Sequence, residues 1–154
     1  MDTKIELKKE FKEFIDTGFG FPVRLLNVPM LKVRGVWTPA IDYNDLALKV
    51  LFGLAHKSSR LTGVEIKFIR THFEKTLQQF AKLFCVSHVA VLKWEKAGRR
   101  ATAMHWSTEK DIRLFILSNH VIKGQDFMQF YTNLQEEPPS KPTQLTLDAK
   151  KLAA

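Results

Sequence analysis

The sequence predicts a mostly α-helical protein with a small β element. Apolar residues recur at helical spacing along most of the chain. The segment 21–41 differs, because it is rich in β-branched and aromatic residues and is interrupted by turn-forming Pro, Gly and Asn. The stretch TLQQFAKLFCVSHVAVLKWE, residues 76–95, has the pattern of two short helices joined by a tight turn. These features predict a domain of five helices preceded by a small α+β module.

Length and composition place the chain among globular proteins. Its 154 residues suit one domain, or one domain with a smaller appendage, and 45% are hydrophobic while 26% are charged. It has no run of 18 apolar residues, and its charged amino terminus is unlike a secretory signal. We therefore expect a cytoplasmic protein with no membrane partner. A single cysteine, Cys85, excludes an internal disulfide and a cysteine-based zinc site.

The charge of the chain is strongly positive and unevenly distributed. The formal net charge is +8 and the pI is about 9.7. Residues 60–123 hold 12 Lys and Arg against 5 Asp and Glu, so nearly all of the surplus lies in that part of the chain. Such a surplus is consistent with a polyanionic partner, although it also attracts polyanions non-specifically.

The amino-terminal elements follow from local patterns. Residues 3–16 carry Leu7, Phe11, Phe14 and Ile15 at helical spacing before Gly18, which predicts an amphipathic helix. The segment 21–41 fits two or three short strands. Residues 43–56 have a broad apolar face after a capping Asp42, which predicts a helix. Together, residues 1–57 are predicted to form an α+β module for dimerisation or partner binding.

The rest of the chain is predicted to be helical up to a proline-rich end. The polar segment 57–60 is interpreted as a hinge, and Thr62 with Glu65 forms a capping box that opens a helix to about Phe73. After the helix pair come a loop over 98–106, a helix capped by Ser107 or Thr108 to about His120, and a short helix over 125–134. Residues 58–135 are the predicted helical domain, and 136–154 a flexible tail.

The helix pair in residues 76–95 is interpreted as a helix-turn-helix motif. Its inward positions are apolar, with the small Ala81 where the two helices approach most closely; they are Phe80, Ala81, Phe84, Val86, Val91 and Trp94. Cys85 occupies the turn, where the chain needs a positive φ that glycine usually supplies. Ser87 is the expected cap of the second helix, and the outward face carries His88, Val89, Leu92 and Lys93. This arrangement is typical of a helix that enters the DNA major groove.

Each outward residue has a chemistry suited to DNA, beside a simpler alternative. His88 can contact a base edge or a phosphate, Val89 a thymine methyl, and Lys93 a guanine or the backbone. The alternative is an ordinary exposed side chain, and for Leu92 we favour packing on another part of the protein. The predicted phosphate contacts lie at the start of the first helix, at the second cap and after the second helix; they are Thr76, Gln78, Ser87, Arg99 and Arg100. For the two arginines a solvated charged loop is the alternative.

At these residues the chain resembles the Xre/Cro-like helix-turn-helix family. Thr76, Ala81, Val86-Ser87 and Trp94-Glu95 match the motif, whereas Leu77 stands where the family usually has a phosphate-bracing glutamine and Cys85 where it has glycine. The resemblance covers about residues 61–117. It implies a five-helix Xre/Cro-like domain acting in a dimeric DNA-binding repressor, so double-stranded DNA is the expected partner and a homodimer the expected state.

More narrowly, the run RLTGVEIKFIRTHFEKTLQQFAKLFCVSHVAVLKWE is similar to the carboxy-terminal domain of regulators of the MqsA/YgiT antitoxin type. In that family a zinc-binding module precedes the helix-turn-helix and, in antitoxins, can bind the toxin. Residues 25–42 have the strand character of such a module but no CxxC pair, so zinc is not implied. The resemblance makes a cognate toxin protein a candidate partner.

No catalytic motif stands beside these features. The chain has no HExxH, glycine-rich phosphate loop or nucleophile elbow, so we expect no enzymatic activity, no cofactor and no metal. RNA binding through its tryptophans is a minor alternative. The sequence thus predicts a sequence-specific DNA-binding transcriptional repressor associated with the nucleoid, acting as the autoregulating antitoxin of a toxin–antitoxin pair. A regulator without a toxin, and an interaction module that has lost DNA binding, are the alternatives.

Overall fold

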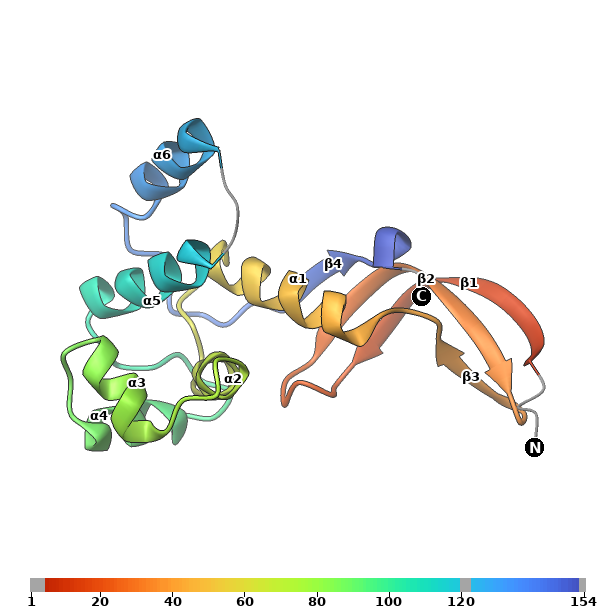
Figure 1. The fold of residues 1–154 in the computed structure, drawn as a ribbon, viewed down its shortest axis with the longest axis horizontal. Helices are drawn as coiled ribbons and strands as arrows, with labels where there is room; N and C mark the ends of the chain where they lie inside the picture. The colour runs from red at the N-terminus through yellow and green to blue at the C-terminus, as the bar shows by residue number, and fades with distance from the viewer. Residues whose placement is uncertain (1–4, 120–122, 153–154) are drawn as a thin grey trace. The chain divides into compact units, whose positions relative to one another are not determined.

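The computed structural model describes residues 5–119 and 123–152, and this part of the chain contains six α-helices and a four-stranded sheet (Figure 1). It divides into two compact units. A sheet unit comprises the residues up to Gly18, Pro22–Val50 and the residues from Gln144 onward, and a helical unit comprises Phe19–Phe21 and Leu51–Thr143. The fold class is therefore α+β. The predicted five helices with only a small β element are wrong, because the sheet is larger than the sequence pattern indicated.

The first two strands form a long antiparallel hairpin. In it β1 (Ile5–Asp16) pairs with β2 (Val23–Val33), from Asp16 opposite Val23 to Leu7 opposite Lys32. The helix predicted over residues 3–16 is wrong for the described part, and residues 3 and 4 lie outside it. Apolar residues at 5, 7 and 11 also fit the alternation of a strand, so the local pattern is ambiguous. Pairing with β2 along almost its whole length decides in favour of a strand.

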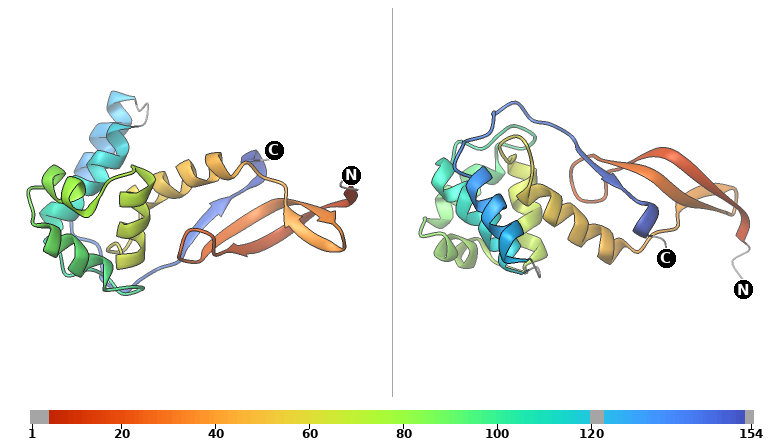
Figure 2. Two further views of the ribbon diagram at one scale, coloured as in Figure 1. Left: turned by 60° about the horizontal axis from the view of Figure 1, so that its bottom comes forward. Right: turned by 90° about the horizontal axis from the view of Figure 1, so that it is seen from above.

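Two short strands pair along the other edge of β2. In antiparallel direction β3 (Val36–Pro39) pairs with residues 30–33 of β2, and in parallel direction β4 (Leu145–Asp148) pairs with residues 23–26 (Figures 1 and 2). The tail predicted to be flexible over 136–154 thus contains a sheet strand. A 3-10 turn, η1 (Lys150–Leu152), follows β4. Leu152 in this turn and Ala149 just before it are buried, and the N–H of Ala149 donates to the Leu26 carbonyl at 2.7 Å. Burial of these apolar side chains favours packing of the segment against the sheet.

The core of the sheet unit is formed by strand residues and by the beginning of α1 (Tyr43–Ala55). Asp42 accepts a hydrogen bond from the N–H of Asn44 at 2.9 Å, so the predicted helix and its cap are confirmed. Asn27, with φ of 54°, marks the point in β2 where the alternation of buried positions changes phase. The buried apolar residues of this unit are Val23, Leu25, Val28, Met30, Ile41, Leu46, Val50, Ala149 and Leu152.

The helical unit contains the end of α1 and five further helices, which confirm the helices predicted between residues 62 and 134. Their bounds are α2 (Gly63–His72), α3 (Leu77–Leu83), α4 (His88–Glu95), α5 (Trp106–Ser118) and α6 (Gly124–Asn133). The capping box of Thr62 with Glu65 is present. His105, rather than Ser107 or Thr108, precedes the first turn of α5, and the predicted helix end at His120 lies outside the described residues.

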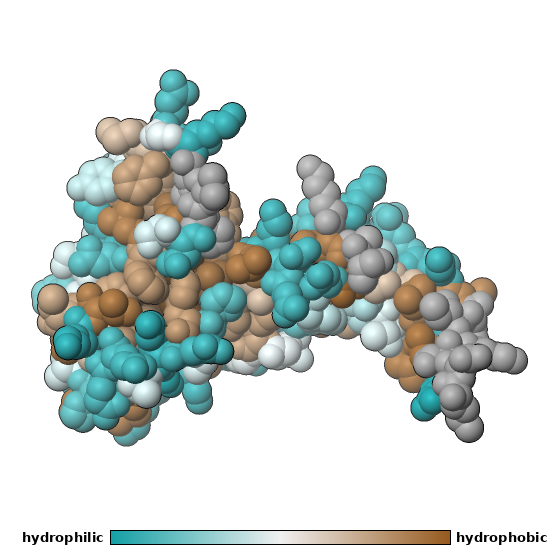
Figure 3. All heavy atoms as spheres, in the orientation of Figure 1, coloured by the Kyte–Doolittle hydropathy of each residue, from teal (hydrophilic) through white to brown (hydrophobic). Residues whose placement is uncertain are grey.

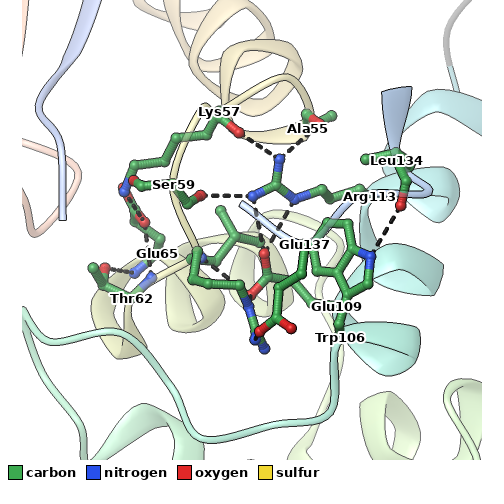
Figure 4. Close-up of polar contacts among 12 residues, drawn as sticks. Ala55, Lys57, Ser59, Thr62, Glu65, Trp106, Glu109, Arg113, Leu134 and Glu137 are labelled. Carbon is green, nitrogen blue, oxygen red and sulfur yellow. Dashed lines mark hydrogen bonds and ion pairs between the residues drawn. The ribbon is translucent and has the colours of Figure 1, made fainter. Parts of the chain in front are cut away.

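The segment 57–60, interpreted from sequence as a polar hinge, is largely buried. Lys57, Ser59 and Arg60 are at most 6% exposed. The ammonium group of Lys57 donates to both carboxylate oxygens of Glu65, at 2.7 and 2.8 Å (Figure 4). The side chains of Lys57, Ser59 and Arg60 therefore face partners inside the helical unit rather than water, which the local composition could not reveal.

The centre of this buried network is Glu109 of α5, whose side chain is fully buried between two arginines (Figure 4). Its Oε1 accepts from Arg60 Nε at 2.8 Å, and its Oε2 accepts from Arg113 Nη2 at 2.9 Å. Arg113 also donates to the carbonyls of Lys57 at 2.6 Å and Ser59 at 2.7 Å. Burial lowers the pKa of Arg113, and the charge of Glu109 opposes that shift. The network ties the connection between α1 and α2 to α5.

Candidate nucleic-acid interface

The first helix of the motif, α3, begins at a complete capping box. Thr76 Oγ1 accepts from the N–H of Gln79 at 3.1 Å, and the N–H of Thr76 donates to Gln79 Oε1 at 2.9 Å. Thr76 and Gln78 are both exposed, as their predicted role at phosphates requires. The hydroxyl oxygen of Thr76 is engaged in the cap, and its hydroxyl hydrogen can still donate to an anion.

The turn between the helices has a left-handed residue where the sequence predicts one. Cys85 has φ of 55°. The N–H of Val86 donates to the Ala81 carbonyl at 3.0 Å and that of Cys85 to the Lys82 carbonyl at 3.4 Å, which is the Schellman pattern of a helix end. Ser87 then caps α4, because its Oγ accepts from the N–H of Ala90 at 3.1 Å. Both predictions, the positive φ and the serine cap, are confirmed.

The predicted inward face of the motif is largely confirmed. Phe80, Ala81, Val91 and Trp94 are at most 8% exposed, whereas Phe84 and Val86 are half-buried. Gly63, at the start of α2, lies against the end of α4: a Cβ there would come within 2.5 Å of the Trp94 carbonyl oxygen. The two helices therefore approach at a distance that only glycine permits.

An ion pair that no local sequence pattern predicts joins α2 to α4. Arg70 Nε donates to Glu95 Oε2 at 2.7 Å and Nη2 to Oε1 at 3.0 Å, while Nη1 donates to the Lys75 carbonyl at 2.9 Å. The hydrogen bonds that Arg70 donates to the Glu95 carboxylate raise the pKa of Arg70. A bidentate pair fixes orientation as well as distance. It neutralises the only carboxylate between residues 76 and 100 and holds the end of α4 beside the start of α3.

The outward face of α4 is exposed along its length. Val89 is 59% and Leu92 39% exposed, and His88 and Lys93 are also exposed. Leu92 is therefore not packed away as the sequence analysis favoured. Figure 3 shows a mainly hydrophilic surface over α3 and α4. Five exposed cations belong to this surface between residues 76 and 100; they are Lys82, Lys93, Lys96, Arg99 and Arg100.

Three of these cations line one hollow at the carboxyl end of α4. The hollow has a volume of about 470 Å³, and Lys93, Lys96 and Arg100 lie on it together with Trp94 and three alanines. Arg99 is exposed but is not among the residues that line it. The structure thus brings Lys93, predicted to read bases, together with Arg100, predicted to contact phosphate. Arg100 and Lys93 offer donors that suit an anionic oxygen.

No group of three or more His, Cys, Asp or Glu side chains in the described residues could hold a metal ion. None of the helices within residues 5–119 and 123–152 is both long and apolar enough to cross a membrane. Comparisons of the chain with protein-family models, with curated proteins and with solved structures found no match.

Proposed function

We propose that the chain binds double-stranded DNA through α3 and α4 and acts as a sequence-specific transcriptional regulator. The observation that carries this proposal is the exposed face of α4, which is fixed by its serine cap, the Arg70–Glu95 pair and the contact at Gly63. An exposed helix with polar and basic side chains has the dimensions and donors that the major groove accepts. The antitoxin role stays a prediction, since no contact within the described residues selects a toxin.

The cations of this surface supply the affinity in this proposal. If the five exposed lysines and arginines between residues 76 and 100 each displace a counterion, the logarithm of affinity should fall with the logarithm of salt concentration with a slope of about −4 to −5. Titration of a labelled random-sequence duplex at several NaCl concentrations measures this slope. Affinity that does not change with salt would contradict the proposal.

Two residues near the start of α4 are the proposed base readers. In helix-turn-helix proteins the amino-terminal residues of the second helix contact base edges, and His88 and Val89 occupy those positions here. With a duplex selected from a random library, His88→Ala should cost about 1–3 kcal/mol and relax preference at one base pair. Lys49→Ala, at an exposed lysine of the sheet unit, is the matched control and should leave both affinity and preference unchanged.

Replacement of Lys93 distinguishes a phosphate contact from a base contact at this position. Its place on the same hollow as Lys96 and Arg100 favours a phosphate contact over the base contact that the sequence suggested. Lys93→Ala should then weaken selected and scrambled duplexes equally and reduce the salt slope by about 1. A selective loss on the preferred duplex would assign Lys93 to base reading instead.

A further inference from the structure

We propose that the sheet unit forms a two-fold symmetric dimer in which β1 pairs antiparallel with β1 of a second copy, with Phe11 opposite its own counterpart. This would join two four-stranded sheets into one. The proposal concerns the sheet unit alone and is independent of DNA binding, because its evidence and its test involve no residue of α3 or α4.

The outer edge of β1 is open. One side of β1 pairs with β2, and none of the other strands in the described part of the chain pairs with it. An edge of this length presents a row of unpaired backbone N–H and C=O groups, which is a template for a further strand. Two large apolar side chains near its ends are exposed, Leu7 at 55% and Ile15 at 41%. Edge pairing would cover both.

The order of charges along β1 selects the partner. In a two-fold antiparallel pair one residue lies opposite its own copy, and the residues on either side pair across that centre. Centring the pair on Phe11 places Leu7 opposite Ile15, Lys9 opposite Glu13 and Glu10 opposite Lys12. Lys8 then lies opposite Phe14, and one like-charge pair, Glu6 with Asp16, falls at the ends of the strand. The central part of the strand, Lys9–Glu13, is therefore complementary to itself in charge and is flanked by an apolar pair, which identifies a second copy of the chain as its occupant.

Most other symmetric registers place like charges at the centre of the pair, where the two strands are held together most closely. Centring on Lys8, Lys9, Glu10, Lys12 or Glu13 places two like charges directly opposite each other, which destabilises a strand pair. Centres nearer to either end of β1 pair about five residues or fewer. Lysines on an edge strand disfavour pairing with other strands, whereas here Glu10 and Glu13 lie among the lysines and can pair with them. The sequence thus favours one register over the length of the strand.

A charge exchange between positions 10 and 12 tests this register. Glu13 is unsuitable because Arg24 of the same chain donates to it at 3.0 Å. Glu10→Lys and Lys12→Glu each create two like-charge pairs per dimer, so each should raise the dimer Kd by about tenfold. The double variant E10K/K12E has the composition and net charge of the original chain and restores both pairs. Its Kd should return to the original value.

The measurement is the mass of the full chain by analytical ultracentrifugation over a range of concentrations. The original chain should change from 17.8 kDa toward twice that mass, with circular dichroism checking that every variant is folded. A monomer at all concentrations overturns the proposal and leaves the edge for a strand of another protein. Single variants that dimerise like the original chain, or a double variant that fails to recover, overturn it as well.

A cysteine at the symmetry centre gives an independent readout. Opposed residues of an antiparallel pair have Cα atoms about 4.5–5.5 Å apart, within the range of a disulfide. In a Cys85→Ser background, Phe11→Cys should form a covalent dimer under mild oxidation. Lys8→Cys should not, because its counterpart would lie six residues away along the strand, about 20 Å. Equal crosslinking of the two variants would contradict the register.

Discussion

Single residues in this structure carry conformations that their types seldom adopt. Cys85 and Glu74 have φ of 55° and 54°, each just after a helix end. In both cases the N–H of the next residue donates to a carbonyl of the preceding helix. Val86 donates to Ala81 at 3.0 Å, and Lys75 donates to Arg70 at 3.1 Å. The carboxyl ends of α2 and α3 thus both have the hydrogen-bond pattern of the Schellman motif, with a residue other than glycine in the left-handed position. The hydrogen bonds and packing offset the cost of the left-handed backbone.

The residue with the largest expected effect on stability is Glu109. Its carboxylate is fully buried and pairs with both Arg60 and Arg113. Glu109→Gln keeps the shape but leaves the buried Arg113 without its carboxylate partner and Arg60 with only the exposed Glu137, so it should lower the free energy of unfolding by about 3–5 kcal/mol. Urea denaturation of the full chain measures the change.

Glu137→Gln provides the matched control for that substitution. Glu137 also pairs with Arg60, but its side chain is 55% exposed. Its replacement should cost at most about 1 kcal/mol, because water screens the pair. Similar losses for the two variants would show that burial does not determine the strength of this network.

At the scale of elements, local signals explain what the sequence could predict. The capping box of Thr62 with Glu65 and the cap at Ser87 could both be predicted, because capping depends on residues only three positions apart. The positive φ of Cys85 followed from the spacing of the two helices. In contrast, Arg70 and Glu95 are 25 residues apart, and no local pattern indicates that their side chains meet. The candidate reading face could therefore be predicted, whereas the ion pair that holds it could not.

The contact between α2 and α4 depends on the absence of a side chain at Gly63. A Cβ there would meet backbone atoms of Trp94, Glu95 and Gly98 at 2.5 to 2.8 Å. Because backbone atoms cannot rotate away, Gly63→Ala should force the helices apart and cost about 1–3 kcal/mol of unfolding free energy. Thermal and urea denaturation measure it.

Gly124→Ala is the matched control for Gly63→Ala, because each glycine is the first residue of its helix. An added Cβ at Gly124, the first residue of α6, meets nothing within 4 Å. It should change stability by less than about 1 kcal/mol, in the favourable direction, since alanine loses less conformational freedom than glycine. A loss at Gly124 as large as that at Gly63 would rule out helix contact as the cause.

At the scale of the whole molecule, the sheet was the part that sequence reasoning could not assemble. Residues 3–16 satisfied a helical pattern, and the decision for a strand comes from the partner β2. β4 lies more than a hundred residues after the strand with which it pairs, for example Leu147 with Leu25. Pairing over such a separation leaves little trace in a local pattern. The helical unit was the more predictable half, because each of its helices is indicated by a local pattern.

Removing the last strand should destabilise one unit and spare the other. A chain ending after Thr143 lacks β4 and the buried Ala149 and Leu152. Loss of this apolar burial should lower the free energy of opening the sheet unit by about 2–3 kcal/mol. Amide hydrogen exchange should then be faster in residues 23–26 of β2 and unchanged in α2 and α4. Uniform acceleration in both units would mean that they unfold as one.

The pairing of β4 with β2 also governs the order in which the two units can fold during synthesis. A ribosome releases residues 51–143, which contain every group of the helical unit beyond Phe21, before it releases Leu145–Asp148. Because nascent domains fold as their segments emerge, the helical unit can become compact while β2 still has an uncovered edge at residues 23–26. The sheet can therefore be completed only after the helical unit has emerged, and until then residues 23–26 of β2 lack their parallel partner.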